Sequence, residues 1–432
     1  MRRDDAWFGA TTGEFAEGSR TRPSGSRHRR IWLRAWLIGA VTLLAGALVM
    51  PGTRADIPFP DDDPFYAAPI DLGEHADGDV LNSRPISVLG LPLPVAGWQL
   101  QYRTTGSDDA ADADMATVLS PITPWTGAGD RPLLSYQIAE DSLGTRCAPS
   151  FALRGGRDFS IATTLLDVPF LAEVLARGWA VVVSDYEGPQ SRFFDGVNSG
   201  RAVLDGVRAA RSFAPLGITA ASPLGAFGYS GGAFATLWAM QLRASYAPDL
   251  WFAGVTSGGV PADIPAIARG VDGGYQAGLA ALILIALARD DSASGLSDEL
   301  NDNGRALLAR EATACGGDLV ASHLQGHVDD YSNTPNLLES QAFLAATGHQ
   351  ELGGWAPDVP LYLYHSTSDD VVPVAGFSAL VDRYCALGAN LTAVHSGIPG
   401  HNPAAIVEST GAMNFLADRF AGTPAPAGCN VR

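Results

Sequence analysis

Short apolar runs recur along the chain and predict a series of strands. Residues 179–185 form one continuous run, which suits a strand covered on both faces, as in a parallel sheet. Residues 98–104 instead alternate between apolar and polar positions, the period of a strand. Further strands are expected at 133–139, 224–229, 251–256, 360–365 and 391–395.

Helix-like stretches separate these strands, at residues 165–177, 198–213, 234–242 and about 403–420. Regular alternation of strands and helices is typical of a mainly parallel sheet flanked by helices. The pattern therefore predicts an α/β fold. Residues 56–69, rich in proline and aspartate, are expected to be extended.

The alternation stops at residue 257, and residues 257–354 form a mostly helical insertion without a convincing strand. The predicted core is thereby divided into a first part, 56–256, and a second part, 355–432. Residues 278–288 are apolar on every side, so a helix there must be buried or face something apolar. We favour a core helix. A cap or lid that lines an acyl-binding cavity is the other interpretation, and the two are compatible.

The first 55 residues differ from the rest. Residues 1–34 carry eight arginines, residues 35–50 are uncharged and mostly apolar, and Pro-Gly-Thr-Arg-Ala follows. This order predicts a secretory signal with cleavage after Ala55; a single membrane anchor is the alternative. The run HRRIWLR at 28–34 loosely resembles a twin-arginine export signal, so Sec and Tat export both stay open.

Composition narrows the chemistry. The chain has 432 residues, of which 47% are hydrophobic, and it contains no lysine among its 28 basic residues. A Ser–Lys dyad, a Schiff-base lysine and a Walker A lysine are therefore excluded. Removing residues 1–55 takes away nine arginines and four acids, which changes the formal net charge from −18 to −23. So acidic a chain is not expected to bind nucleic acid.

Four cysteines lie in the exported part: Cys147, Cys315, Cys385 and Cys429. An even number in an oxidising compartment predicts two disulfides, for which three pairings exist. No Cys-x-x-Cys pair is present, so neither a zinc site nor another metal site is expected.

The motif Gly-x-Ser-x-Gly occurs once, at 228–232, between an expected strand and an expected helix. That order is typical of a nucleophile elbow, which would expose Ser230 at a sharp turn above a helix N-terminus. Unpaired N–H groups at such a terminus can face an oxyanion. With 49 glycines in the chain, an ordinary Gly-rich turn is the alternative.

A serine nucleophile needs a base and an acid, which follow it in that fold in the order Ser, Asp or Glu, His. Asp369 and Asp370 follow the expected strand 360–365, and we choose Asp369 because it lies nearer the strand. Asp370 is the alternative.

Of eight histidines, only His401 lies both downstream of the acid and on an expected loop, so it is the predicted base. The others are His28, His75, His323, His327, His349, His365 and His395. For an oxyanion hole, the N–H of Gly231 is the first expected donor. The second is expected from the loop at 140–142, where Asp141 could equally be a plain turn residue.

Five segments carry a family resemblance: YQIAEDS at 136–142, SDYEGP at 184–189, LDGVRAA at 204–210, GYSGG at 228–232 and HSTSDDVVP at 365–373. With them the chain resembles the secretory lipase family of α/β-hydrolases, typified by lipase A of Candida antarctica, over nearly all of its exported part. The resemblance implies an α/β-hydrolase fold with residues 257–354 as cap and lid over an acyl tunnel.

The resemblance also implies roles for individual residues. Ser230 would be the nucleophile, Asp369 the acid and His401 the base, with the backbone N–H groups of Asp141 and Gly231 as the oxyanion hole. The implied disulfides are Cys147–Cys315 and Cys385–Cys429.

The expected function is a secreted serine ester hydrolase, extracellular or in the cell envelope. We expect a lipase that cleaves acylglycerol esters through an acyl-enzyme intermediate at a lipid–water interface, without metal or organic cofactor. A carboxylesterase for short soluble esters is the alternative. A serine peptidase, an acyltransferase or an inactive hydrolase-fold binding protein is less favoured. The oligomeric state and the natural substrate stay open.

Overall fold

The continuous apolar run at residues 179–185 forms strand β5 (Ala180–Ser184), in which every residue is buried. Ala180 and Val182 join one apolar cluster, whereas Val181 and Val183 join another. Alternate side chains therefore fill both faces, as the continuous run predicts. The structure is a computed structural model that describes residues 57–432 except 89–90, 92–93 and 157–161. The expected leader and its cleavage site lie outside the described residues.

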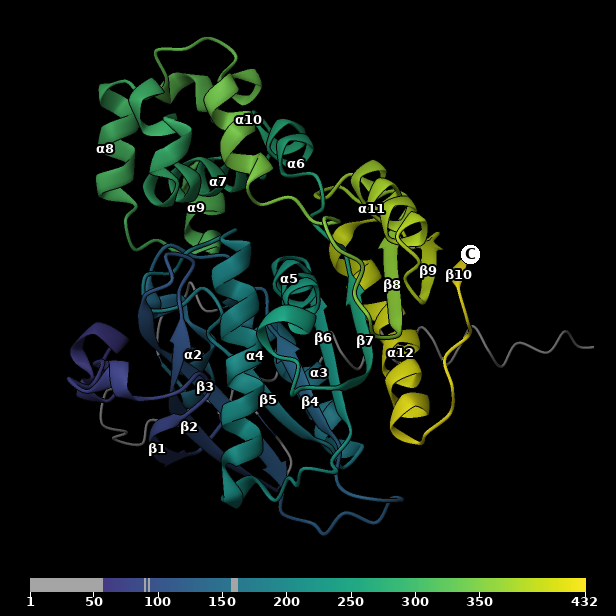
Figure 1. Ribbon diagram of the computed structural model, residues 1–432. Coiled ribbons are helices and arrows are strands. Elements are labelled where there is room, and N and C mark those ends of the chain that lie inside the picture. Colours follow the sequence, from purple (N-terminus) through teal and green to yellow (C-terminus); the bar gives the residue numbers. More distant parts are fainter. Residues whose placement is uncertain (1–56, 89–90, 92–93, 157–161) are drawn as a thin grey trace, which may run out of the picture. The chain divides into compact units, whose positions relative to one another are not determined.

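Within the described residues, one sheet of ten strands has the order β1-β2-β3-β5-β4-β6-β7-β8-β9-β10 (Figure 1). Strands β4 to β10 run parallel to one another, and β1 to β3 form an antiparallel extension that joins the sheet at β5. The expected mainly parallel sheet is confirmed. The bounds of the other strands are β1 (Val80–Ile86), β2 (Val95–Thr105), β3 (Ala111–Pro121), β4 (Leu133–Gln137), β6 (Leu224–Tyr229), β7 (Phe252–Gly258), β8 (Leu361–Ser366), β9 (Leu391–Ser396) and β10 (Cys429–Val431).

The N-terminal region departs from expectation in two ways. Strand β3 pairs with β2 along its whole length, although it begins with the acids Asp112 and Asp114, which weaken a strand pattern. Residues expected to be extended instead form short 3-10 helices, η1 (Pro60–Asp62) and η2 (Pro64–Tyr66). Each of these helices begins with a proline, whose fixed φ suits a first helical turn.

Helices cover both faces of the sheet. Helices α4 (Gly196–Ser212), α5 (Gly231–Tyr246) and α11 (Val374–Ala386) contribute to the cluster that contains Val182. Helices α3 (Ala162–Ala176) and α12 (His401–Phe420) contribute to the cluster that contains Val181. Helix α2 (Pro149–Arg154) packs against α3, β3 and β5.

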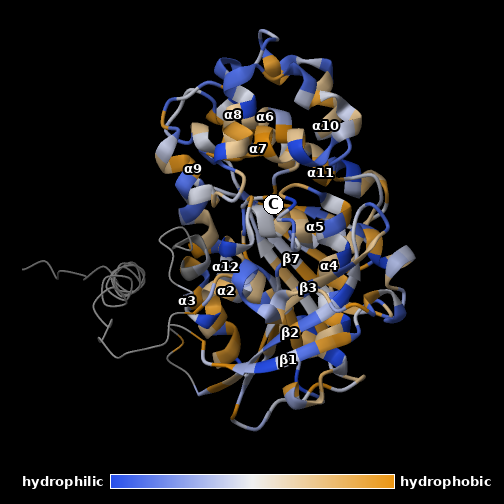
Figure 2. Cartoon of the chain, turned by 90° about the vertical axis from the view of Figure 1, so that its left-hand side faces the viewer, coloured by the Kyte–Doolittle hydropathy of each residue, from blue (hydrophilic) through white to orange (hydrophobic). Residues whose placement is uncertain are grey.

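Between β7 and β8 the chain forms five α-helices in the described residues: α6 (Ile264–Val271), α7 (Ala277–Asp290), α8 (Asp302–Arg310), α9 (Gly316–Ser322) and α10 (Gln341–Gly348). Every residue of α7 from 280 to 288 is buried, and Figure 2 shows this helix largely in the hydrophobic colour. Helix α7 packs against α6, α8, α9 and α10, so it is the expected core helix.

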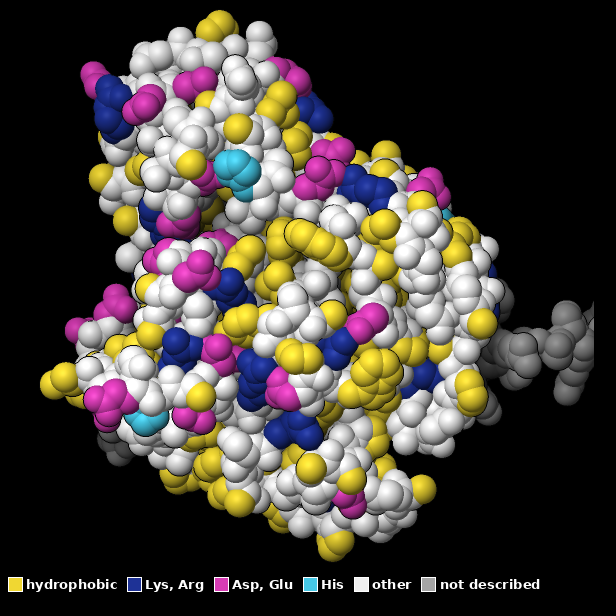
Figure 3. Space-filling view, in the orientation of Figure 1, with side chains coloured by type: hydrophobic (Ala, Val, Ile, Leu, Met, Phe, Trp, Pro, Cys, Tyr) yellow, Lys and Arg dark blue, Asp and Glu magenta, His cyan; other side chains and the backbone are white. Residues whose placement is uncertain are grey.

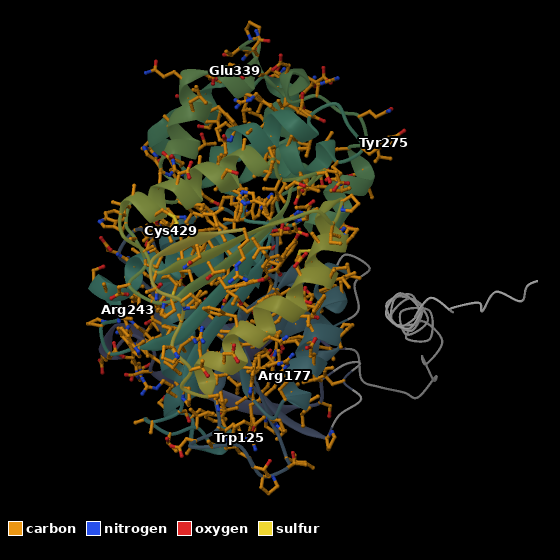
Figure 4. All side chains as sticks on the ribbon, turned by 90° about the vertical axis from the view of Figure 1, so that its right-hand side faces the viewer. Trp125, Arg177, Arg243, Tyr275, Glu339 and Cys429 are labelled. Atoms are coloured by element: carbon orange, nitrogen blue, oxygen red, sulfur yellow. A yellow bond between two sulfur atoms is a disulfide. The ribbon has the colours of Figure 1, made fainter. Side chains whose placement is uncertain are left out.

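Two disulfides join distant segments: Cys147–Cys315 and Cys385–Cys429. The first links the segment before α2 to the residue before α9, and the second links α11 to β10, where Figure 4 labels Cys429. These are the pairs that the family resemblance implies. None of the described helices combines the length and apolar character needed to cross a membrane.

Arginines pair with acids. The partly exposed Arg208 binds Asp249, and the buried Arg243 binds Asp358. Figure 3 shows the same pattern across one face, where arginine side chains lie beside acidic ones. The scattered positive charges are therefore offset locally.

Removing a disulfide tests the link to the insertion. Cys147–Cys315 spans 168 residues and Cys385–Cys429 spans 44, and a longer closed loop restricts the unfolded chain more. Replacing Cys147 and Cys315 together by serine is expected to cost about 2–5 kcal/mol of unfolding free energy. Denaturant unfolding measures this loss, with the Cys385/Cys429 double serine variant as control. An equal or smaller loss than in the control would contradict the expectation.

Candidate active site

The residues expected to carry the chemistry meet at the carboxyl edge of the parallel strands. Asp141, Ser230 and Asp369 lie in the loops that follow β4, β6 and β8, and His401 lies just beyond the loop that follows β9. Carboxyl ends of parallel strands share one edge, which is where ligands bind in open α/β sheets. In Figure 4 the insertion, with Tyr275 and Glu339, lies at the end opposite Trp125.

The turn from β6 into α5 is strained at Ser230, which has φ 56° and ψ −125°. A side chain at Gly228 would strike the carbonyl oxygen of Gly232, and one at Gly232 would strike the carbonyl oxygen of Gln137. Glycine is therefore required at both positions, as in a nucleophile elbow. The serine backbone is held by a 3.0 Å hydrogen bond from its N–H to the carbonyl of Gly258.

His401 connects the serine to the acid. Its Nε2 lies 2.9 Å from Ser230 Oγ and its Nδ1 lies 2.7 Å from Asp369 Oδ2. Since the carboxylate accepts from Nδ1–H, Nε2 is left to accept the serine proton. His401 was expected on a loop, but it is the first residue of α12, because that helix starts two residues before Pro403.

Asp369 is fixed from several sides. Its Oδ1 accepts the N–H groups of Val371 at 2.9 Å and Val372 at 2.8 Å, and its side chain is fully buried. Burial alone would raise the pKa of Asp369, but hydrogen bonds from His401 and from these N–H groups outweigh it and hold the pKa below its usual range. Asp370, the alternative acid, instead accepts the backbone N–H of His401 at 2.8 Å and does not contact the ring.

Two residues that the sequence did not single out orient His401. The Tyr229 hydroxyl donates to the His401 carbonyl at 2.6 Å, and its ring lies 4.9 Å from the imidazole. Gly259 has φ 57°, and a side chain there would strike both Tyr229 and His401. The Ser-Gly-Gly run at 257–259 was the only sequence signal that Tyr229 and His401 approach the backbone of Gly259 closely.

The remaining described histidines lie elsewhere or make local contacts. They pair as His75 with Asp71 and Asp79, His323 with Glu311, His327 with Asp272, His349 with Asp291, His365 with the Val372 carbonyl and His395 with Ser378. His28 lies outside the described residues. No group of three or more metal-ligating side chains comes together in the described part of the chain.

Two backbone donors face the same region. Neither Asp141 N–H nor Gly231 N–H has an acceptor among the described residues, and Asp141 Oδ1 packs against Gly231. Asp141 has a φ of 44°, an uncommon conformation for a non-glycine residue, and its carbonyl accepts the N–H of Gly316 at 2.8 Å. Burial raises the pKa of its carboxyl group to about 6, and the charge of His401 opposes this rise.

The fold and the site together define a serine hydrolase of the α/β-hydrolase class. Residues 153–428 match the secretory lipase family. A "Probable inactive lipase" of Mycobacterium tuberculosis is 34% identical over 372 residues, covering 84% of this chain and 83% of that protein. "Secreted triacylglycerol lipase LIP2" of Malassezia furfur is 32% identical over 384 residues, covering 86% and 81%.

A solved structure is also similar to this chain. Candida antarctica lipase A in its closed state superposes with a TM-score of 0.80 at 32% identity, covering 87% of this chain and 89% of that one. The chain belongs to the secretory lipase family. The expected α/β-hydrolase fold and ester hydrolase class are thereby confirmed.

Neighbouring acids provide a matched pair of variants. Asp369→Asn is expected to lower kcat about 10⁴-fold, because an amide can hold His401 in the wrong tautomer. Asp370→Asn keeps an acceptor for the His401 backbone N–H, so its kcat is expected to stay within about tenfold of the unchanged protein. Ester hydrolysis rates measure both. Equal losses in the two variants would contradict the choice of Asp369.

Buried acids should make stability fall as pH rises. Burial raises the pKa of Asp185 and of Asp167 to about 7. The folded protein therefore binds protons more tightly than the unfolded chain between about pH 4 and pH 7, and stability is lost across that window. We expect a higher Tm at pH 5 than at pH 8, and a smaller difference in Asp167→Asn. A Tm that rises with pH would contradict this.

Proposed function

We propose that the protein is a secreted lipase that cleaves acylglycerol esters through an acyl-enzyme intermediate. The observation that carries the proposal is the pair of hydrogen bonds made by His401, 2.9 Å to Ser230 Oγ and 2.7 Å to Asp369 Oδ2. A serine hydroxyl within hydrogen-bond reach of an oriented imidazole meets the geometric requirement for nucleophilic catalysis.

In the proposed reaction, Ser230 Oγ attacks the ester carbonyl carbon while His401 Nε2 takes the serine proton. The N–H groups of Asp141 and Gly231 stabilise the oxyanion, and Asp369 stabilises the imidazolium. His401 then returns the proton to the departing alcohol. Water activated by His401 releases the acid, and no step requires a metal or an organic cofactor.

The lipid substrate is supported by the relative named a triacylglycerol lipase and by the apolar insertion. We propose that residues 257–354 act as a cap and lid between the two core segments, 56–256 and 355–432. Contacts between this insertion and the loop of Asp141 support a role close to the ester. A carboxylesterase for short esters remains the alternative.

The relative named an inactive lipase raises the opposite proposal, a hydrolase fold that binds without catalysis. That name concerns the mycobacterial protein. In this chain Ser230, His401 and Asp369 are all present and within hydrogen-bond distance, which supports catalysis.

Secretion is proposed on the leader expected at residues 1–55, on a relative named as secreted and on two disulfides. Disulfides persist in oxidising compartments outside the cytosol. Mass spectrometry of the exported protein measures the mature N-terminus, which is expected at Asp56.

Covalent labelling tests whether the site is catalytic. A fluorophosphonate is expected to modify one serine, Ser230, because only an activated hydroxyl displaces fluoride readily. Ser230→Ala should abolish labelling and lower ester hydrolysis on the order of 10⁴-fold or more. Ser378→Ala, which alters a hydrogen bond to His395, is the control and should label normally. An unlabelled natural protein would reject the enzyme proposal.

Chain-length preference separates a lipase from an esterase. Hydrolysis of p-nitrophenyl esters from acetate to palmitate, with and without an oil interface, is expected to favour long chains and to rise at the interface. Activity confined to short soluble esters would reject the lipase and leave the carboxylesterase.

A further inference from the structure

Beside the loop of Asp141 lies a group of buried carboxyl groups: Glu140, Glu187, Asp185 and Asp114. Their exposed fractions are 2%, 0%, 3% and 2%. None of them forms an ion pair with an arginine or histidine in the described part of the chain; Arg289 acts on Glu187 only through its charge. Burying a carboxylate without a cation is costly, so these groups need hydrogen bonds or protons.

Two of the four acids have donors of their own. Asp185 accepts the N–H and the hydroxyl of Ser150, and Asp114 accepts the Tyr102 hydroxyl and the N–H of Met115. Glu140 differs, because both of its carboxyl oxygens are buried and neither accepts from a side chain; only the backbone N–H of Glu187 faces its carboxyl group. It is the one member of the group that lacks a side-chain donor.

Glu187 contacts the residue that follows the expected oxyanion donor. Its Oε2 accepts the Ser142 hydroxyl at 2.8 Å and the Ser142 N–H at 3.2 Å. On the other side, the N–H of Glu140 donates to the Tyr186 hydroxyl at 3.1 Å. Both N–H groups that flank Asp141 are thus occupied, whereas that of Asp141 stays free for a substrate.

The direction of the hydrogen bonds from Ser142 indicates which of the two glutamates is protonated. Both Ser142 donors point to Glu187, so Glu187 acts as an acceptor. Glu187 exerts the largest charge effect on Glu140, followed by Asp185 and Asp114. Two buried carboxyl groups repel each other when both are ionised, and the group without a side-chain donor is the one that gains from carrying a proton.

We propose that the pair of Glu140 and Glu187 retains one proton, carried by Glu140, and that Glu187 is a positioning residue for the Asp141 N–H. This rests on the proposed role of Asp141 in the oxyanion hole. Titratable groups from several elements face Glu140 and Glu187. They are Asp114 from β3, Asp141 from the loop of Glu140, Asp185 and Tyr186 from the loop after β5, and Arg289 from α7. Burial raises the pKa of both glutamates well above the usual range, in agreement with a retained proton.

Infrared spectroscopy tests the proton without any activity measurement. The difference spectrum between the natural protein and Glu140→Gln at neutral pH is expected to contain the C=O stretch of an un-ionised carboxylic acid. A difference that contains only carboxylate bands would overturn the proton retained on Glu140. This readout stays valid if the proposed function fails, so the two failures are distinguishable.

Kinetics test the positioning role. Glu187→Leu is expected to lower kcat roughly 10- to 100-fold, because the oxyanion donor loses its support, while KM changes little. Glu187→Gln retains a carbonyl acceptor for Ser142 and should recover most of the loss. Glu140→Gln, which supplies a permanent donor, should keep kcat near that of the natural protein.

Two outcomes would overturn the positioning role: an unchanged kcat in Glu187→Leu, or equal losses in the leucine and glutamine variants. If the leucine variant does not fold, Ser142→Ala replaces it, since it removes one of the two donors to Glu187. That variant should lower kcat severalfold at constant KM. An unchanged kcat there would also overturn the proposal.

Discussion

The buried hydrogen bond between His401 and Asp369 is the constraint on which the arrangement of the site depends. It joins residues that are 32 positions apart, and His401 reaches Ser230 across 171 positions. Such contacts require β6, β8 and β9 to end at the same edge, which a parallel sheet guarantees. The apolar clusters on both faces fix those strands, so the packing of the core determines the alignment of three polar side chains.

The helical segment between β7 and β8 contacts the loop of Asp141 directly. Residues 314–316 pair with residues 141–143, through hydrogen bonds from Gly316 to Asp141 and from Leu143 to Ala314. Cys147–Cys315 and the guanidinium of Arg289, which donates to the Leu143 carbonyl, reinforce that pairing. Displacing residues 314–316 would therefore carry the loop of Asp141 with it, so the lid proposed for residues 257–354 would have to open around this anchored segment.

Much of this could be predicted from sequence, because the signals are local. The continuous run at 180–184 marks a strand buried on both faces. Chain order, together with position after an expected strand, favours Asp369 over its alternative Asp370 and selects His401. Strand β3 was missed because its acid Asp114 is stabilised by the hydroxyl of Tyr102, a partner on the neighbouring strand that no local pattern reveals.

Tertiary contacts explain the other omissions. Gly259 matters because the ring of His401 approaches it, and Tyr229 because its hydroxyl meets the carbonyl of His401. Glu187 resembled an ordinary loop residue, yet it holds Ser142 from 45 positions away. Residues that position other residues have no characteristic spacing in the sequence. Only the assembled fold therefore identifies them.

The most direct test of the account is acid quenching during the first turnover of a p-nitrophenyl ester, followed by mass spectrometry of the peptides. The account predicts one acyl group per chain, attached to Ser230, with p-nitrophenol released in a burst of equal size. Ester hydrolysis that leaves no acyl group on the protein, or leaves it on another residue, would contradict it.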